Sequence, residues 1–394
     1  MDWTNKLKVL QKLADEKILK SHEKINLNGE ILISFNYTNK CVFEKAWNEL
    51  TLNARGTIYN KKTGAIVAKA FPKFFNVDQT ASTKLDVLPW HTPFEITDKM
   101  DGSLGIVYPN GVDADGKIEW AVATRGSFDS LQAIKGTDIL KKYDLSKLNP
   151  LTTILVEIIY PAGKIQLDYG DKEELIIIGA YHITQSPKDN KWMTYDVGRK
   201  ELETLAKTMV MPITPILENG DITDLMHRKT LSAVEQESIE GWVIKFPYHN
   251  RDKFGMDGLR VKIKTDHYVS VARAQSQLGP LLIWEKLVDG TMEEFISSLP
   301  DELQEEATHI GETIMKQFTT LYSHVNLIYK KVNDLHSAKA KVLAIKSLGL
   351  SKWLETASIV MVSKGQCKSM IHKLIRPSNN TFVNMNDFPL KKTR

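Results

Sequence analysis

Over the first two thirds of the chain, short apolar runs rich in β-branched and aromatic residues alternate with polar turn segments. This pattern is typical of strands. It predicts strands at residues 31–37, 57–59, 65–71, 103–108, 117–124, 154–160, 175–181 and 242–246. Asn- and Gly-rich segments at residues 60–64 and 110–116 predict hairpin loops, so we expect the strands to pair in antiparallel sheets.

Helical spacing interrupts this strand pattern in a few places. In residues 4–20, an apolar stripe of Leu7, Leu10, Leu13 and Ile18 predicts one amphipathic helix. Further helices are predicted at residues 198–207 and 230–236. The first two thirds of the chain therefore have the mixed pattern of an α+β domain.

After about residue 271, apolar residues recur at spacings of three and four, which is the pattern of amphipathic helices. One long stripe consists of Leu303, Ala307, Ile310, Ile314, Phe318, Leu321, Val325 and Ile328. Thr291 and Glu294 have the spacing of a capping box at the start of the preceding helix. Helical patterns continue at residues 337–345, 352–362 and 367–375. We therefore predict an α+β domain at residues 1–272, followed by an all-α domain at residues 273–394.

The composition suits a soluble globular protein of two domains, with 394 residues of which 42% are hydrophobic and 25% charged. A formal net charge of +4 is compatible with a polyanionic partner but does not require one. Two cysteines, Cys41 and Cys367, cannot build a disulfide framework or a zinc site, so we expect a reducing, cytoplasmic location. No apolar run has transmembrane length, so no membrane association is expected.

Residues 99–103, Lys-Met-Asp-Gly-Ser, place a lysine, a carboxylate and a glycine where a strand begins. A lysine in this setting can attack the α-phosphate of a nucleotide and form a covalent lysyl-nucleotide intermediate. Because lysine normally titrates near 10.4, the reaction needs a cationic or desolvated surrounding that favours the neutral amine. The motif alone is weak, since it occurs by chance in about one chain in ten of this length. Its alternative interpretation is a hairpin turn with a surface lysine.

Other charged residues stand inside or at the ends of apolar strand segments, where an unpaired charge would be costly. In chain order these residues are Arg55, Lys73, Arg125, Glu157, Glu240, Lys245, Lys262 and Lys264. Each is therefore expected to face a cleft or a partner charge. Lys262 and Lys264 are two residues apart, so a strand points both amines to one face. An anion between them, such as a triphosphate or an RNA phosphate, would relieve their repulsion.

This ordered set resembles the nucleotidyltransferase motifs of the covalent ligase and capping superfamily. Within it, the chain resembles the RNA ligase 1 family, which is typified by a bacteriophage enzyme. The resemblance runs from residue 33 to residue 270, and residues 73–76, Lys-Phe-Phe-Asn, and 262–270 are its most specific segments. The C-terminal region matches only by its length and helical pattern.

The resemblance implies a role for each matching residue. Lys99 resembles the adenylated nucleophile. Glu157 resembles the carboxylate that meets the ribose hydroxyls or the water shell of a metal, and Glu240 resembles a second carboxylate that assists metal binding. Lys262 and Lys264 resemble the lysine pair on the ATP phosphates.

A flanking set resembles the residues that position nucleotide phosphates and RNA ends. Its members are Tyr37, Arg55, Lys73, Phe75 and Arg125, with Gly102 and Tyr268 as further positions near the site. Gly102 is expected to let the backbone approach the nucleotide, and Phe75 could stack on a base. The family typically has lysine where this chain has Arg125, and the planar fork of arginine would alter that contact.

The family resemblance implies an ATP-dependent RNA ligase that joins 5′-phosphate and 3′-hydroxyl ends through lysyl-AMP and 5′-adenylated RNA. It implies Mg²⁺, with Mn²⁺ as a substitute, and cations near Lys99 that lower the pKa of its amine. The implied partners are single-stranded RNA ends, among them a tRNA cut at its anticodon. We expect a monomer that acts in the cytoplasm, which is the host cytoplasm if a phage encodes it.

Several alternatives stay open. Arg55 and Arg125 could be surface charges, Glu240 could end a strand, and Phe75 could be a core aromatic residue. The chain could also be a capping-type guanylyltransferase, or an RNA-binding module that has lost catalysis. DNA ligases and capping enzymes usually continue into a β-rich OB-fold, so a helical region after Lys264 favours RNA ligation. Basic residues of that region could face RNA phosphates or only solvent; they are Lys364, Lys368, Lys373 and Arg376.

Overall fold

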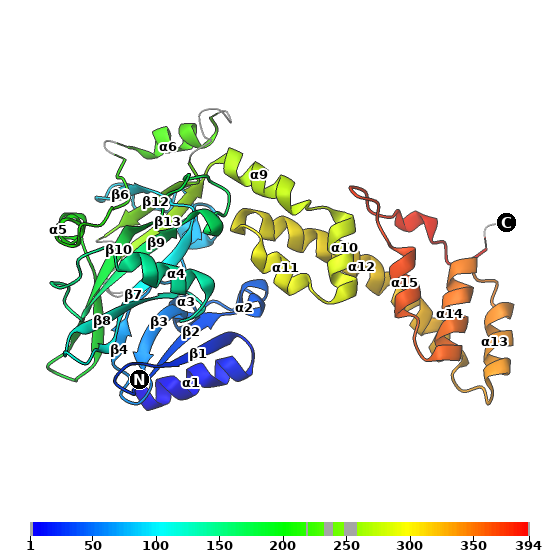
Figure 1. Ribbon diagram of the computed structural model, residues 1–394. Coiled ribbons are helices and arrows are strands. Elements are labelled where there is room, and N and C mark those ends of the chain that lie inside the picture. The colour runs from blue at the N-terminus through cyan, green and yellow to red at the C-terminus, as the bar shows by residue number, and fades with distance from the viewer. Residues whose placement is uncertain (1–2, 218–219, 232–238, 248–257, 393–394) are drawn as a thin grey trace. The chain divides into compact units, whose positions relative to one another are not determined.

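The computed structural model describes residues 3–217, 220–231, 239–247 and 258–392 (Figure 1). The chain divides into two compact units, Met1–Ala272 and Arg273–Arg394. The first unit combines three β-sheets with helices, and the described part of the second unit is built from helices. The predicted α+β class is therefore confirmed, and antiparallel pairing dominates the sheets.

The first sheet has four antiparallel strands and carries helix α1 (Trp3–Asp15) on one face. Its strands are β1 (Leu19–Ile25), β2 (Ile31–Tyr37), β3 (Arg55–Asn60) and β4 (Ile66–Ala68). The helix predicted at residues 4–20 is too long, because the chain turns at Lys17, whose φ is +61°, and Ile18 leads into β1. Two short helices, α2 (Asn39–Phe43) and α3 (Glu49–Asn53), lie between β2 and β3.

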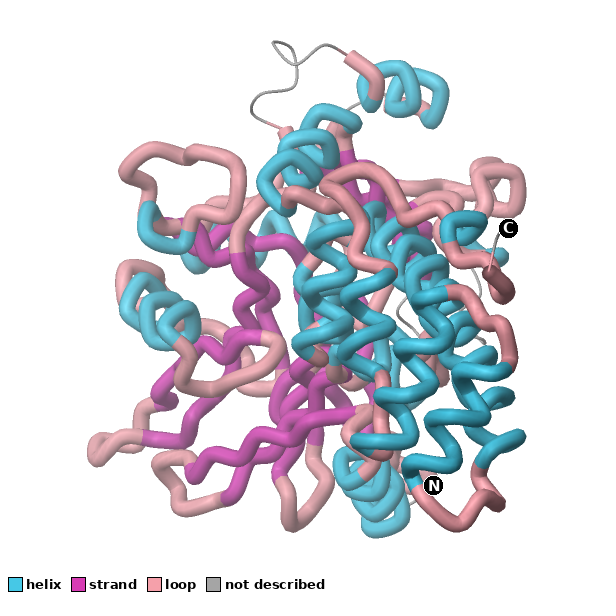
Figure 2. The backbone as a smooth tube through the Cα atoms, turned by 90° about the vertical axis from the view of Figure 1, so that its right-hand side faces the viewer, coloured by secondary structure: helices cyan, strands magenta, loops and turns pink. Residues whose placement is uncertain are grey.

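The second sheet has five antiparallel strands in the order β11-β10-β9-β7-β8. They are β7 (Ser103–Val112), β8 (Ile118–Thr124), β9 (Thr152–Ile159), β10 (Glu174–Gln185) and β11 (Trp192–Asp196). Helices α4 (Leu131–Leu140) and α5 (Arg199–Met209) cover one face through a shared apolar core. The other face packs against the first sheet through a second apolar core. This buried position explains why Glu157, in the middle of β9, has apolar neighbours on both sides. Figure 2 shows the strands of the first unit in magenta.

The third sheet holds the lysine pair. Its strands, in spatial order, are β5 (Phe75–Asn76), β13 (Leu259–Lys264), β12 (Gly241–Phe246) and β6 (Glu95–Asp98). β5 pairs with β13 in parallel, which is an exception to the predicted antiparallel pairing. An apolar core with helix α6 (Ile222–Lys229) covers one face. The helix predicted at residues 230–236 lies mostly outside the described residues.

The second unit begins within helix α9 (Asp266–Ser276) and is organised around one long helix. Its further helices are α10 (Pro280–Asp289), α11 (Met292–Ser298), α12 (Asp301–Val332), α13 (Ala338–Ser347), α14 (Lys352–Lys364) and α15 (Lys368–Leu374). The apolar stripe predicted from Leu303 to Ile328 forms the buried face of α12. The predicted capping box is wrong, because the Thr291 hydroxyl makes no cap hydrogen bond and is buried without a partner among the described residues.

Two expectations about the environment can be compared with the structure. Cys41 and Cys367 are both buried and form no disulfide. Among the described residues, every helix is too short or too polar to span a bilayer.

Candidate active site

Lys99 lies in the connection between β6 and β7, facing the start of β12. Its backbone N–H donates to the carbonyl of Gly241 at 2.8 Å. Its Nζ lies 2.7 Å from Oε1 of Glu240, and the same oxygen lies 3.3 Å from Nζ of Lys264. One buried carboxylate thus bridges the candidate nucleophile and one member of the lysine pair.

The surroundings of Lys99 shift the pKa of its amine. Burial alone would lower it, but the neighbouring Glu240 and Glu157 carboxylates outweigh burial and raise the pKa above its ordinary value. The contact with Glu240 therefore favours the ammonium form of Lys99. The nearest charged group is the Glu240 carboxylate, and the expectation that Mg²⁺ and the lysine pair lower this pKa when ATP binds stays a prediction.

Glu157, on β9, interacts electrostatically with Lys99. Its Oε1 accepts a hydrogen bond from the backbone N–H of Gly102 at 3.1 Å. Burial raises the pKa of Glu157 to about 7, with Lys99 opposing and Glu240 adding to the shift. Two carboxyl groups therefore share a desolvated space around one lysine.

These two carboxyl groups fit a divalent cation. Oε2 of Glu240 is buried and has no hydrogen-bond partner among the described residues, so an acceptor lone pair is left for a ligand. No three His, Cys, Asp or Glu side chains converge on a metal position within the described parts of the chain. A cation held by Glu240 or Glu157 would therefore take its remaining ligands from water and phosphate, as Mg²⁺ commonly does.

Gly102 has a packing role in addition to the expected approach to a nucleotide, which stays a prediction. A Cβ at this position would lie 2.7 Å from the carbonyl oxygen of Ile158 and 2.7 Å from Cδ1 of Ile159. Both belong to β9, so the glycine allows β7 to pack closely against the strand that carries Glu157.

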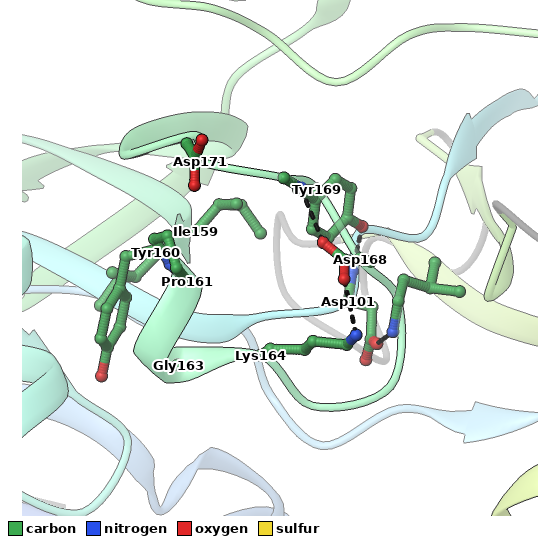
Figure 3. A pocket seen from close by; sticks show the side chains of 12 residues that line it. Asp101, Ile159, Tyr160, Pro161, Gly163, Lys164, Asp168, Tyr169 and Asp171 are labelled. Atoms are coloured by element: carbon green, nitrogen blue, oxygen red, sulfur yellow. Dashed lines mark hydrogen bonds and ion pairs between the residues drawn. The ribbon is translucent and has the colours of Figure 1, made fainter.

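Asp101, the third residue of the lysine motif, anchors a loop beside the site (Figure 3). Its buried carboxylate accepts hydrogen bonds from the backbone N–H groups of Gln166 and Leu167 at 2.9 and 2.7 Å, and from the Tyr268 hydroxyl at 2.8 Å. Its own backbone N–H donates to the Tyr169 hydroxyl at 2.9 Å. The sequence reasoning assigned no role to this side chain, and Tyr268 acts here as its partner.

The loop and Asp101 line a cavity of about 350 Å³. Figure 3 shows Asp101 and Tyr169 at one end of this cavity and Tyr160 at the other. Lys164 and Asp168 of the same loop form an ion pair of 2.8 Å. The Tyr268 ring lies 5.0 Å from Nζ of Lys264, so the Asp101 network also supports the lysine strand.

The lysine pair lies as predicted on one face of β13, because buried Val261 and Ile263 alternate with partly exposed Lys262 and Lys264. Gly241 opposes Lys264 with a φ of +150°, and a Cβ there would collide with the carbonyl oxygen of Ile263. The Glu-Gly sequence at residues 240–241 is thus a structural requirement for placing Glu240 beside the lysines. This glycine signal was present in the sequence but was not used.

A second group of predicted residues surrounds Tyr37. Arg125 donates to the Tyr37 hydroxyl at 2.9 Å, and its guanidinium lies 5.1 Å from the ring. Gly56 has a φ of +95°, and a Cβ added to it would lie 3.0 Å from the Cα of Arg125. The glycine therefore lets β3 approach Arg125. Arg55 precedes Gly56 in the chain. Burial lowers the pKa of the Arg55 guanidinium, and the charge of Arg125 lowers it further, whereas Tyr37 and Glu157 raise it. One guanidinium nitrogen of Arg55 is buried without a partner among the described residues.

Lys73 and Phe75 extend this group. Nζ of Lys73 lies 5.2 Å from the Phe75 ring and 6.0 Å from the Trp47 ring. Trp47 is not among the site residues predicted from the sequence. β5 pairs Asn76 with Lys262, so Phe75 lies next to the lysine strand. The structure thus brings the predicted site residues into two groups. Lys99, Glu157, Glu240 and Lys264 form one, and the residues around Tyr37 form the other.

The sequence was then compared with known protein families. The model of the T4-type RNA ligase family, described as RNA ligase, matches residues 53–268, which is more than half of the chain. The chain belongs to this RNA ligase family. The matched range contains Arg55, Lys99, Glu157 and both lysines of β13, and the predicted family resemblance is confirmed.

Individual relatives of this RNA ligase family member are distant. A protein of Thermovibrio ammonificans, provisionally named an RNA ligase, is 25% identical over 269 residues. The match covers 66% of this chain and 62% of that relative, so the chain spans less than two thirds of its length. Solved structures of Naegleria gruberi RNA ligase variants are also similar. One with ATP and Mn is 18% identical with a TM-score of 0.31, and covers 45% of this chain and 50% of that chain. Another, with AMP and Mn, is 17% identical with a TM-score of 0.30, and covers 45% and 51%.

Proposed function

We propose that this chain is an ATP-dependent RNA ligase that joins 5′-phosphate and 3′-hydroxyl RNA ends. The observation that carries the proposal is the contact of Lys99 with Glu240, whose same oxygen contacts Lys264. This contact supports the proposal, because a lysine, a carboxylate and a second amine lie within a few ångströms in a chain of the RNA ligase family. We propose them as nucleophile, cation ligand and phosphate ligand.

In the first step ATP would bind with its phosphates on Lys262 and Lys264, so that Lys264 exchanges Glu240 for a phosphate oxygen. Mg²⁺ or Mn²⁺, held by Glu240 and Glu157, would supply positive charge to the phosphates. Lys99, released from Glu240, loses a proton to solvent, and its amine attacks the α-phosphorus. The N–P bond forms as the bond to the pyrophosphate oxygen breaks, which leaves AMP on Lys99.

Two further steps would complete the reaction. A 5′-phosphate oxygen of RNA attacks the phosphorus of the lysyl-AMP, the N–P bond breaks, and the amine of Lys99 takes back a proton. The product is RNA with a 5′-5′ pyrophosphate link to AMP. The 3′-hydroxyl of a second end then attacks the RNA phosphorus, loses its proton and displaces AMP, which forms the phosphodiester. Arg55, Lys73 and Arg125 are the cations proposed to hold the RNA phosphates.

The charge distribution of the second unit supports an RNA partner. Residues 273–334 contain 5 Lys and Arg against 10 Asp and Glu, whereas residues 335–394 contain 11 against 2. Positive charge is therefore concentrated around α13, α14 and α15, where Lys364, Lys368, Lys373 and Arg376 lie. A cationic segment of this kind fits a folded polyanion such as tRNA. We propose tRNA cut at its anticodon as the target, repair as the role, and a monomer in the cytoplasm as the active form.

The test is incubation of the full chain with ATP labelled at the α-phosphate and Mg²⁺, followed by a denaturing gel. Label should stay with the protein and be absent in Lys99→Arg, which keeps the positive charge beside Glu240 but removes the nucleophile. Labelling by GTP instead of ATP would identify a capping-type guanylyltransferase. RNA binding without label from either nucleotide would identify a non-catalytic RNA-binding module. Joining of a 5′-phosphorylated RNA strand, compared with a DNA strand, then tests the acceptor.

A further inference from the structure

Trp47 lies in the connection between α2 and α3, and its backbone is fixed from both sides (Figure 1). Before it, Lys45 has a φ of +51°, and the Trp47 N–H donates to the Lys45 carbonyl at 2.7 Å, which closes a tight turn. After it, Asn48 caps α3 in a capping box with Thr51. The turn uses an uncommon backbone conformation, so the position of the indole is specified closely.

The indole of Trp47 stands in the middle of a row of aromatic rings. It contacts Tyr37 at 5.0 Å and Phe75 at 5.8 Å, both edge to face. Cations stand at both ends of this row, with Lys73 at 5.2 Å from Phe75 and Arg125 at 5.1 Å from Tyr37. Trp47 is partly exposed and is absent from the set of residues so far given a role. Aromatic rings interleaved with cations are the arrangement that binds single-stranded nucleic acid.

The chemistry of the proposed ligase determines which strand reaches this row. Displacement at phosphorus places the attacking and leaving atoms on opposite sides. In the first step Lys99 attacks and pyrophosphate leaves, and in the second step the RNA phosphate attacks and Lys99 leaves. Pyrophosphate and the RNA 5′-phosphate therefore occupy the same side of the phosphorus. The RNA 5′-phosphate thus arrives on the side of Lys262 and Lys264, which are proposed to hold the pyrophosphate. β5 pairs with this lysine strand and carries Phe75, one ring of the row.

We propose that Trp47 stacks on the first base of the 5′-phosphorylated RNA strand, while the neighbouring cations hold its phosphate. This inference rests on the proposed ligase function and adds a specificity-determining residue to it. The indole would bind any base, because every base offers a π-face. A strand without a base at its first nucleotide would lose this contact.

The test compares AMP transfer from the adenylylated full chain to two 5′-phosphorylated RNA strands, one intact and one abasic at its first nucleotide. Trp47→Leu keeps an apolar side chain against the core but removes the π-face, and Trp47→Phe keeps a π-face. The intact strand is used below saturation. Trp47→Leu should then lower transfer, relative to lysyl-AMP formation, by about 5-fold to 150-fold, the range for loss of one stacked base. Trp47→Phe should retain most of the wild-type rate. Phe43→Leu is the matched control, since Phe43 ends α2 nearby and is 39% exposed.

The abasic strand gives the decisive comparison. The wild type should lose transfer to it by about the factor seen for Trp47→Leu, and the variant should lose little more. Three results would each overturn the inference. Trp47→Leu could transfer AMP to the intact strand at the wild-type rate, or the abasic strand could slow the variant by the same factor as the wild type. Trp47→Leu could also lose lysyl-AMP formation to the same extent as transfer. These results leave the ligase function standing if the wild type joins RNA. A wild type that forms no lysyl-AMP, or transfers none to RNA, overturns the ligase proposal and this inference together.

Discussion

Asp101 provides the sharpest test of how the loop at residues 160–171 is held beside the site. Its carboxylate is 3% exposed and accepts hydrogen bonds from the backbone of Gln166 and Leu167 and from the Tyr268 hydroxyl. In Asp101→Ala, all three donors lose their acceptor. A hydrogen bond to a charged group contributes about 1.5–3 kcal/mol. Opening of each loop amide should therefore become about 10- to 150-fold more favourable.

Asp101→Asn should have a smaller effect than Asp101→Ala. Its amide oxygen can accept from the two backbone N–H groups, and its NH₂ group can donate to the Tyr268 hydroxyl, which is also an acceptor. The variant therefore keeps the number of hydrogen bonds and loses only the charge. A hydrogen bond to a charged acceptor is stronger than one to a neutral acceptor by about 1 kcal/mol. We expect the free energy of loop opening to fall by about this amount in Asp101→Asn.

Hydrogen exchange followed by mass spectrometry of peptides covering residues 160–171 measures this opening in the full chain. Asp168→Asn is the matched control, since Asp168 is in the same loop, its side chain is 68% exposed and it forms a surface ion pair with Lys164. Loss of such a pair should change exchange less than about fivefold. Unchanged exchange in Asp101→Ala would show that the carboxylate does not hold the loop. Equal effects of Ala and Asn would contradict the count of acceptors.

Three further predictions concern separate parts of the chain. Val210 is 76% exposed, ends α5 and has a left-handed φ of +56°, so Val210→Gly should stabilise the protein by about 1 kcal/mol and raise Tm. An unchanged or lower Tm would contradict the strain argument. Burial raises the pKa of Glu157 from 4.5 to about 7. Between these two pH values, the folded chain therefore holds a proton that the unfolded chain has already released. Stability should therefore fall as pH rises from 4.5 to about 7, and urea midpoints of Glu157→Gln should lack this slope. Lys368→Glu and Lys373→Glu should each weaken RNA binding and flatten its salt dependence by about one phosphate contact. Lys316→Glu, in the acidic part of the second unit, should not.

The elements that local patterns specify were predicted well. The long apolar stripe of α12 and the alternation of Lys262 and Lys264 along β13 depend only on residues near in sequence. β1 was not predicted, because its sequence, Leu-Lys-Ser-His-Glu-Lys-Ile, is mostly polar. The strand lies at the edge of its sheet. Its strand conformation depends on pairing with β2, which no pattern within β1 reveals.

The members of the site were predictable, but their contacts were not. Family resemblance pointed to Lys99 and Glu240, yet the ion pair between them joins residues far apart in sequence, and it raises the pKa of Lys99 in the chain alone. The role of Asp101 depends on backbone N–H groups of a loop more than 60 residues away. Trp47 carried no motif, and only the packing of β2, β5 and the loop before α3 places it beside Tyr37 and Phe75.

In the proposed ligase, the carboxylate shared by Lys99 and Lys264 would make activation depend on two events. A triphosphate alone can draw Lys264 away from Glu240, but Glu240 then still neutralises Lys99. A divalent cation alone can occupy Glu240, but Lys264 then loses its counter-charge with no phosphate to replace it. Only the simultaneous arrival of both leaves Lys99 next to positive charges, which is the condition that favours its neutral amine.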